Sequence, residues 1–122
     1  TNPRQEAAVW NARIRKSWLW GELKVGVIGE PVDLTYQYEH LGDGPEALKG
    51  LFGRDSEIAE ALRNAERPMI VIGDHALCRE DGAALMAAAH DYALEIGAIK
   101  DDWEGFGVLH NAAARIGALD IG

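Results

Sequence analysis

The chain is poor in cysteine, and this limits the chemistry that it can support. It has 122 residues and one cysteine, Cys78, so no disulfide can form within it. An iron–sulfur cluster requires about four cysteine ligands, and structural zinc requires four ligands that usually come in two close pairs. His75 and Cys78 form a single H-x-x-C pair, with no second pair evident. We therefore expect no disulfide, cluster or metal in this segment.

Long apolar runs and an excess of basic residues are also lacking. No apolar stretch approaches the roughly 20 residues that span a bilayer. There are 20 acidic against 12 basic residues and a formal net charge of -8, whereas binding to nucleic acid or anionic lipid needs clustered Lys and Arg. We therefore expect neither nucleic acid nor membrane insertion. The chain begins with Thr1 rather than Met and shows no signal-peptide pattern, which suggests a fragment of a larger subunit.

Glycine-rich phosphate-binding turns are missing as well. Neither G-x-G-x-x-G nor G-x-x-x-x-G-K-[ST] occurs. In an open parallel sheet, ligands bind at the carboxyl ends of the strands, and the turns expected there carry Glu30, Asp33 and Asp74. Because these carboxylates would repel a pyrophosphate, the pattern favours two solvated turns over a nucleotide crevice, and we predict no cofactor-binding residue.

Apolar periodicity predicts alternating helices and strands. Asn2 and Pro3 begin a first helix that ends at Gly21, with the apolar stripe Trp10, Ile14 and Trp18. Continuous apolar runs at 24–29 and 69–73 are typical of buried strands, and 30–38 is predicted to be a turn and an extended piece. Four more helices are predicted, after 42–45, after Asp55 or Ser56, after Asp81 and from about Gly107. Their stripes are Leu48, Leu51 and Phe52; Ile58, Ala61, Leu62 and Ala65; Leu85, Ala88, Tyr92 and Ile96; and Leu109, Ala112, Ile116 and Leu119.

This alternation predicts an α/β fold, a three-layer sandwich with a small, mainly parallel, Rossmann-like sheet. Each apolar strand is followed by Gly and an acidic turn, a weak internal echo that favours parallel strands joined by right-handed crossovers. Two strands make a thin sheet, so we expect a neighbouring strand in sequence outside this chain. Residues 1–122 are therefore predicted to be a single domain or part of one.

Catalytic groups are not evident in the sequence. Cys78 as a nucleophile would need a base and an orienting group, and a free cysteine is more often a small buried hydrophobe. Asp101, Asp102 and Glu104 lie beside Trp103, which favours a polar loop with an anchoring aromatic over an acid–base pair. We predict no catalytic residue.

The segment at 13–20 is the most distinctive, because it is basic and aromatic within an acidic chain. One interpretation is a solvated helix face, with Lys16 near the negative end of the helix dipole. The other is an interface, since Trp and Arg anchor protein contacts. The candidate interface residues are Arg13, Arg15, Lys16, Trp18 and Trp20.

Several strings resemble, in register, the large iron–sulfur subunit of the proton-pumping NADH:quinone oxidoreductase (complex I). They are TNPRQEA at 1–7, NARIRKSW at 11–18, PVDLTYQYEHLG at 31–42, RPMIVIG at 67–73 and DGAA at 81–84. That subunit is similar, over its C-terminal part, to the molybdopterin oxidoreductases. In those relatives, an Asn-Pro element matched here by Asn2 and Pro3 belongs to a domain that helps to hold a pterin dinucleotide. The resemblance implies that the complex I branch has lost this cofactor.

The resemblance also implies a noncatalytic structural module, inactive alone, within an enzyme that passes electrons from NADH through FMN and iron–sulfur clusters to quinone. It places the module in the peripheral arm, on the cytoplasmic side of a bacterial inner membrane or on the matrix side in mitochondria. Its partners would be the rest of its own subunit and other peripheral-arm subunits. Two alternatives remain: a binding domain that retains a weak pterin or guanine-nucleotide site, and a small receiver-like regulator that would need Lys100 beside an acidic pocket.

Overall fold

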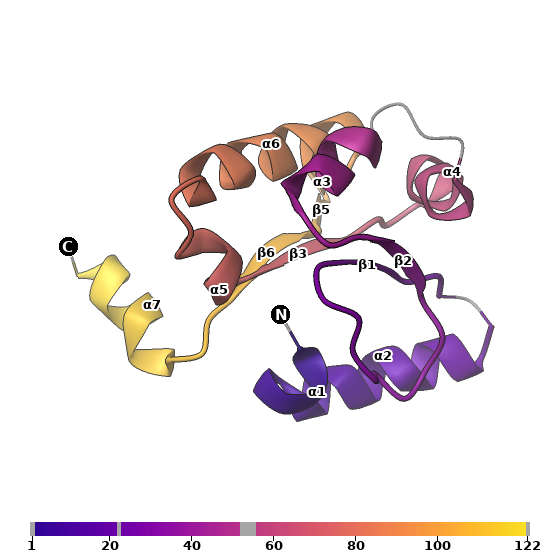
Figure 1. The fold of residues 1–122 in the computed structure, drawn as a ribbon, viewed down its shortest axis with the longest axis horizontal. Helices are drawn as coiled ribbons and strands as arrows, with labels where there is room; N and C mark the ends of the chain where they lie inside the picture. The colour runs from indigo at the N-terminus through magenta and orange to yellow at the C-terminus, as the bar shows by residue number, and fades with distance from the viewer. Residues whose placement is uncertain (1, 22, 52–55, 122) are drawn as a thin grey trace.

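The chain folds into helices interspersed with short strands in the computed structural model, which describes residues 2–21, 23–51 and 56–121 (Figure 1). Its elements are α1 (Pro3–Glu6), α2 (Ala8–Leu19), β1 (Gly26–Ile28), β2 (Glu39–Gly42), α3 (Pro45–Leu51), α4 (Glu57–Asn64), β3 (Ile70–Gly73), α5 (Asp74–Leu77), α6 (Gly82–Glu95), β4 (Ile99–Lys100), β5 (Trp103–Glu104), β6 (Phe106–Leu109) and α7 (Ala113–Asp120). The predicted α/β class is confirmed.

The strands form two parallel pairs, β1–β2 and β3–β6, and an antiparallel β4–β5 hairpin. Parallel pairing was expected and is found, but among the described residues the two apolar strands β1 and β3 lie in separate sheets, and each pairs with a strand that the local pattern did not predict. Residues 29–38 connect the first pair without a helix, whereas α5, α6 and the hairpin connect the second. In Figure 1, α3 and α6 lie on one side of the strands, and α1 and α2 lie on the other. This arrangement gives the expected order of helix layer, strand layer and helix layer.

The main hydrophobic core lies between α6 and the strands. Tyr92, Ala93 and Ala89 of α6 are buried together with Ile72 of β3 and Ile96. Leu85 and Ala88 pack against this cluster, so the stripe predicted for this helix is confirmed. The helix ends at Glu95, two residues before Gly97, whose φ of 71° a residue without a Cβ adopts at little cost.

Two predicted helix starts are confirmed by side-chain caps. The Asn2 side chain accepts a hydrogen bond from the Arg4 N–H, and Ser56 accepts one from the Ala59 N–H. Each bond satisfies an N–H that has no partner within its helix. The alternative cap Asp55 lies outside the described residues, as does Phe52. Asp81 precedes α6 as predicted, but its side chain pairs with Arg79 instead of capping the helix.

Three boundaries differ from the prediction. The first helix is interrupted at Ala7, whose φ of −146° is not helical, so α1 and α2 are separate. The chain that follows the extended piece at 30–38 pairs with β1 and becomes β2. The helix expected from Gly107 is wrong at its start, because Phe106–Leu109 pairs with β3 and the helix begins at Ala113. For both strands, a contact distant in sequence outweighs the local pattern.

Candidate interface and strand-end turns

Helix α2 divides the predicted interface residues between two faces. Arg13, Lys16 and Trp20 lie on the outward face and are exposed, with Trp20 66% accessible. The Lys16 ammonium lies 4.9 Å from the centre of the Trp20 ring, a distance suited to a cation–π contact. Val9, one turn before Arg13, is 76% exposed. The outward face therefore presents two cations between two large apolar side chains.

The other two predicted residues face inward, toward the connection between β1 and β2. Arg15 donates a hydrogen bond from Nε to the Thr35 carbonyl oxygen at 3.2 Å. The rings of Trp18 and Tyr36 are 6.5 Å apart between centroids. Both residues therefore contact the connection, although the Arg15 side chain stays exposed.

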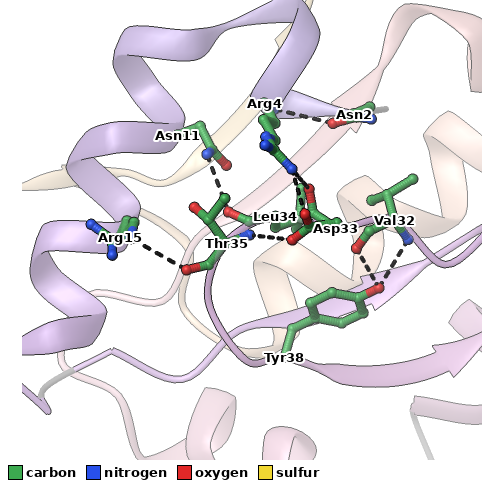
Figure 2. A network of polar contacts seen from close by, with 9 residues as sticks. All are labelled: Asn2, Arg4, Asn11, Arg15, Val32, Asp33, Leu34, Thr35 and Tyr38. Carbon is green, nitrogen blue, oxygen red and sulfur yellow. Dashed lines mark hydrogen bonds and ion pairs between the residues drawn. The ribbon is translucent and has the colours of Figure 1, made fainter.

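A polar network fixes the same connection to the N-terminal helices (Figure 2). Asn11 is buried, donates to the Leu34 carbonyl oxygen at 3.3 Å and accepts from the Tyr36 hydroxyl at 3.0 Å. Arg4 pairs with Asp33 at 2.5 Å. The Thr35 N–H bond and the Arg4 guanidinium hold the pKa of Asp33 below its ordinary value. No sequence pattern indicated Asn11, because its role depends on a segment over twenty residues away.

Thr35, inside this network, has a strained backbone. Its φ is 69°, and a β-branched residue rarely adopts this left-handed conformation. Its N–H donates to Asp33 Oδ1 at 2.9 Å, and its carbonyl accepts from Arg15. Strain of this kind costs on the order of 1–3 kcal/mol and persists where the surroundings fix the residue from several sides. The network therefore sets the backbone path as well as the side chains.

The turn after β1 uses its backbone donors internally. The Gly29 N–H donates to the Gly42 carbonyl at 2.8 Å, and the Val32 N–H donates to the Tyr38 hydroxyl at 3.0 Å. The Tyr38 hydroxyl in turn donates to the Val32 carbonyl at 2.8 Å. A phosphate-binding turn needs N–H groups directed at the anion. At this strand end those of Gly29, Val32 and Thr35 are already bonded within the chain.

The carboxyl ends of β3 and β6 bring Asp74 and His110 together. Asp74 Oδ1 lies 4.0 Å from His110 Nδ1, and both side chains are largely buried. His110 was not predicted as a neighbour of Asp74, because the sequence pattern placed it on a helix rather than at the end of a strand. His75 lies on α5 and Cys78 directly follows it, and both residues are exposed. Within 2–21, 23–51 and 56–121, no group of three or more His, Cys, Asp or Glu side chains is arranged to hold a metal ion.

The hairpin region is an anchored loop. Trp103 donates from Nε1 to the Pro68 carbonyl oxygen at 2.8 Å, as expected for an anchoring aromatic. Lys100 donates to the Glu66 carbonyl at 2.7 Å. Because this ammonium is bonded to the backbone ahead of β3, the contact does not support the receiver-like alternative, which requires the lysine beside an acidic pocket.

The α/β architecture, with its small parallel strand pairs, is consistent with the fold of the family to which the sequence belongs. The chain is a member of the molybdopterin oxidoreductase family, whose sequence model matches residues 1–122.

Among individual relatives, the chain is similar to subunits of one respiratory enzyme. It is 37% identical over 124 residues to the mitochondrial NADH-ubiquinone oxidoreductase 78 kDa subunit of Neurospora crassa, covering all of this chain and 16% of that protein. It is 40% identical over 121 residues to the G-type NADH-quinone oxidoreductase subunits of Rickettsia bellii and Rickettsia felis, covering 99% of this chain and 18% of each relative. The resemblance to the complex I subunit is confirmed, and the chain spans less than a fifth of these relatives.

The strand ends do not fit the pterin dinucleotide that the family name implies. Glu30 and Asp33 are exposed carboxylates after β1, and Asp74 lies immediately after β3. The cofactor's phosphates are anionic, so the carboxylates of Glu30 and Asp74 oppose binding, whereas the charge of Asp33 is paired with Arg4. The N–H groups of Gly29, Val32 and Thr35 are engaged as described above. We therefore assign no residue of this chain to the pterin.

The helices are also unlike membrane spans. Across residues 2–21, 23–51 and 56–121, no helix combines the length and apolar character that crossing a bilayer requires.

Proposed function

We propose that this chain is a noncatalytic structural module of the large iron–sulfur subunit of proton-pumping NADH:quinone oxidoreductase. The observation that carries the proposal is the match over the whole chain to subunits named for that enzyme, of which it spans 16–18%. The strand-end carboxylates support a scaffold, because they oppose the anionic ligand of the wider family. On this proposal the chain alone is inactive.

The parent complex transfers electrons from NADH through FMN and iron–sulfur clusters to quinone and translocates protons. The flavin and clusters would lie elsewhere in the complex, and this segment would supply none of their ligands. The module would lie in the peripheral arm, on the cytoplasmic side of a bacterial inner membrane or the matrix side in mitochondria. Its partners would be the rest of its subunit and other peripheral-arm subunits.

The outward face of α2 is the proposed contact with a neighbouring subunit. Arg13, Lys16 and Trp20 retain the properties that suggested an interface in the sequence, namely charge and a large exposed aromatic ring. Arg15 and Trp18 are assigned instead to positioning the 29–38 connection. The proposed interface is therefore smaller than the segment first predicted.

The test is assembly of the complex by the full-length subunit. A tagged subunit carrying this sequence should co-purify with FMN, iron–sulfur clusters and NADH:quinone reductase activity. Lys16→Glu should lower the recovered activity because it reverses a charge at the proposed contact. Lys49→Glu, at an exposed position on α3, is the matched control and should leave recovery unchanged. A tagged subunit that purifies alone, without flavin or clusters, would refute the proposal.

Guanine nucleotide binding would distinguish a scaffold from a domain that retains a ligand site. Unfolding is followed with and without guanine nucleotide at about millimolar concentration, since a ligand that binds only the folded state raises its stability by mass action. No shift is expected. A saturable rise in the midpoint would instead support the binding-domain alternative.

A further inference from the structure

The β3–β6 pair has one face packed against α6 and an opposite face on which α2 leaves an apolar hollow. Strand residues alternate between faces. Ile72 of β3 is part of the core, and Phe106 of β6 meets His90 of α6 edge-on at 5.6 Å between ring centroids. These contacts place α6 on the face that carries Ile72 and Phe106. Val71 and Gly107, which are partners in register, therefore lie on the opposite face.

An apolar hollow occupies this opposite face. Its lining includes Met69, Val71, Gly105, Gly107 and Leu109, together with Glu104 and with Trp10 of α2. Met69 is 48% exposed. Figure 1 shows the N-terminal part of α2 on the side of these strands away from α6. Parallel sheets are normally covered on both faces, so an apolar hollow on this face is unusual for a complete fold.

Two glycines, Gly105 and Gly107, line the hollow and differ in the free space around them. A Cβ at Gly107 would meet nothing within 4 Å. Gly105, two residues earlier, differs, because a Cβ there would clash with the Pro68 carbonyl oxygen and with Trp103 Nε1. A glycine within a strand often marks the close approach of another backbone. At Gly105 that neighbour belongs to the chain, whereas at Gly107 no neighbour is present among the described residues.

We propose that a segment of the same polypeptide, outside residues 1–122, packs its apolar side into this hollow against Val71 and Gly107. The inference rests on the proposed function, in which the chain is part of a longer subunit. The occupant is assigned to the same polypeptide because the relatives match this chain over 16–18% of their own length. The apolar lining fits an apolar segment, and the missing side chain at Gly107 lets it approach closely.

Photo-crosslinking of the full-length subunit tests which molecule occupies the hollow. A benzophenone amino acid is placed at Val71 and, in a second variant, at Met69, and the products are mapped by mass spectrometry. Both positions should cross-link within one polypeptide to a common segment outside 1–122. A cross-link to a second copy, to another protein or only within 1–122 would overturn the inference, as would no cross-link in either variant.

A substitution tests the close approach independently. Gly107→Leu should lower the unfolding midpoint of the full-length subunit, because the new side chain would occupy space used by the docked segment. Gly117→Leu is the control, since a Cβ at Gly117 also meets nothing within 4 Å, and it should not lower the midpoint, because leucine is a better helix former than glycine within α7. An unchanged midpoint for Gly107→Leu would overturn the inference.

Failure of the proposed function gives a different pattern. A subunit that does not join complex I, yet still shows the intramolecular cross-link, would refute the function and retain the packing. A subunit that joins the complex but shows no intramolecular cross-link would retain the proposed function and refute the proposed packing.

Discussion

The two parallel strand pairs differ in what holds each connection in place. Residues 29–38 join β1 to β2 and are held in place by hydrogen bonds to α1 and α2. The buried Asn11 makes two of these bonds. The β3–β6 connection runs through α6, whose buried Tyr92 and small residues form the core. Hydrogen bonds are directional, and apolar burial is not. The first connection should therefore respond most to loss of a polar partner or to pH, and the second to loss of volume.

Truncating Tyr92 should have the largest effect. Its side chain is 1% exposed, and replacing a large aromatic core residue with alanine costs about 3–5 kcal/mol. Urea unfolding of wild type and Tyr92→Ala measures the change. Leu94→Ala, on the exposed side of the same helix at 51% exposure, should change stability by no more than about 0.5 kcal/mol. Equal effects would show that α6 does not carry the core.

Adding a side chain at Gly105 should have the second largest effect on stability. Gly105→Ala places a Cβ against the Pro68 carbonyl and Trp103 Nε1, whose mutual hydrogen bond is 2.8 Å. Overpacking of this kind costs about 1–3 kcal/mol. In the same 122-residue chain, Gly107→Ala should be nearly neutral because its Cβ meets nothing. Thermal melts of both variants measure the difference, and equal losses would contradict the difference in free space around the two glycines.

Removing Asn11 tests the polar connection directly. Asn11→Ala deprives the Tyr36 hydroxyl and the Leu34 carbonyl of their partner, and a buried unsatisfied group costs about 1–3 kcal/mol. A double-mutant cycle with Tyr36→Phe separates the shared bond from the rest. Non-additive losses in urea unfolding are expected. Strict additivity would mean that the 3.0 Å contact contributes nothing.

The smallest effect should be the pH dependence contributed by Asp33. The Thr35 N–H and Arg4 lower its folded-state pKa below 3.8. Stabilisation by a carboxylate with a lowered pKa is complete above its unfolded pKa and is lost as pH falls through the folded value. The stability difference between wild type and Asp33→Asn should therefore shrink from about pH 5 to about pH 2. Carboxyl NMR titration gives the pKa, and a value above 3.8 would contradict the pairing.

Local patterns predicted one strand of each parallel pair, β1 from the run at 24–29 and β3 from the run at 69–73. The run at 69–73 and the stripe through Tyr92 are determined by burial of neighbouring residues, so periodicity located both. Glu39–Gly42 has no comparable apolar run and becomes a strand because β1 lies beside it. Phe106–Leu109 has apolar residues compatible with helix or strand, and only pairing with β3 decides between them.

The candidate interface was also predicted only in part, because contacts between segments distant in sequence decide which side chains are available. The distinctive composition at 13–20 located α2, but sequence could not say which side chains face the 29–38 connection. Arg15 and Trp18 turn inward because Thr35 and Tyr36 lie there. His110 and Asp74 meet only because β3 and β6 are parallel and end at the same edge.

The single exposed thiol also has a practical consequence. Cys78 follows α5 at the C-cap position and is the chain's one cysteine. A maleimide dye would therefore label residues 1–122 at one defined place, just after α5, without mutagenesis. The same thiol can join two molecules under oxidising conditions. Measurements of self-association should therefore be made in reductant, so that a disulfide-linked pair is not mistaken for a docked one.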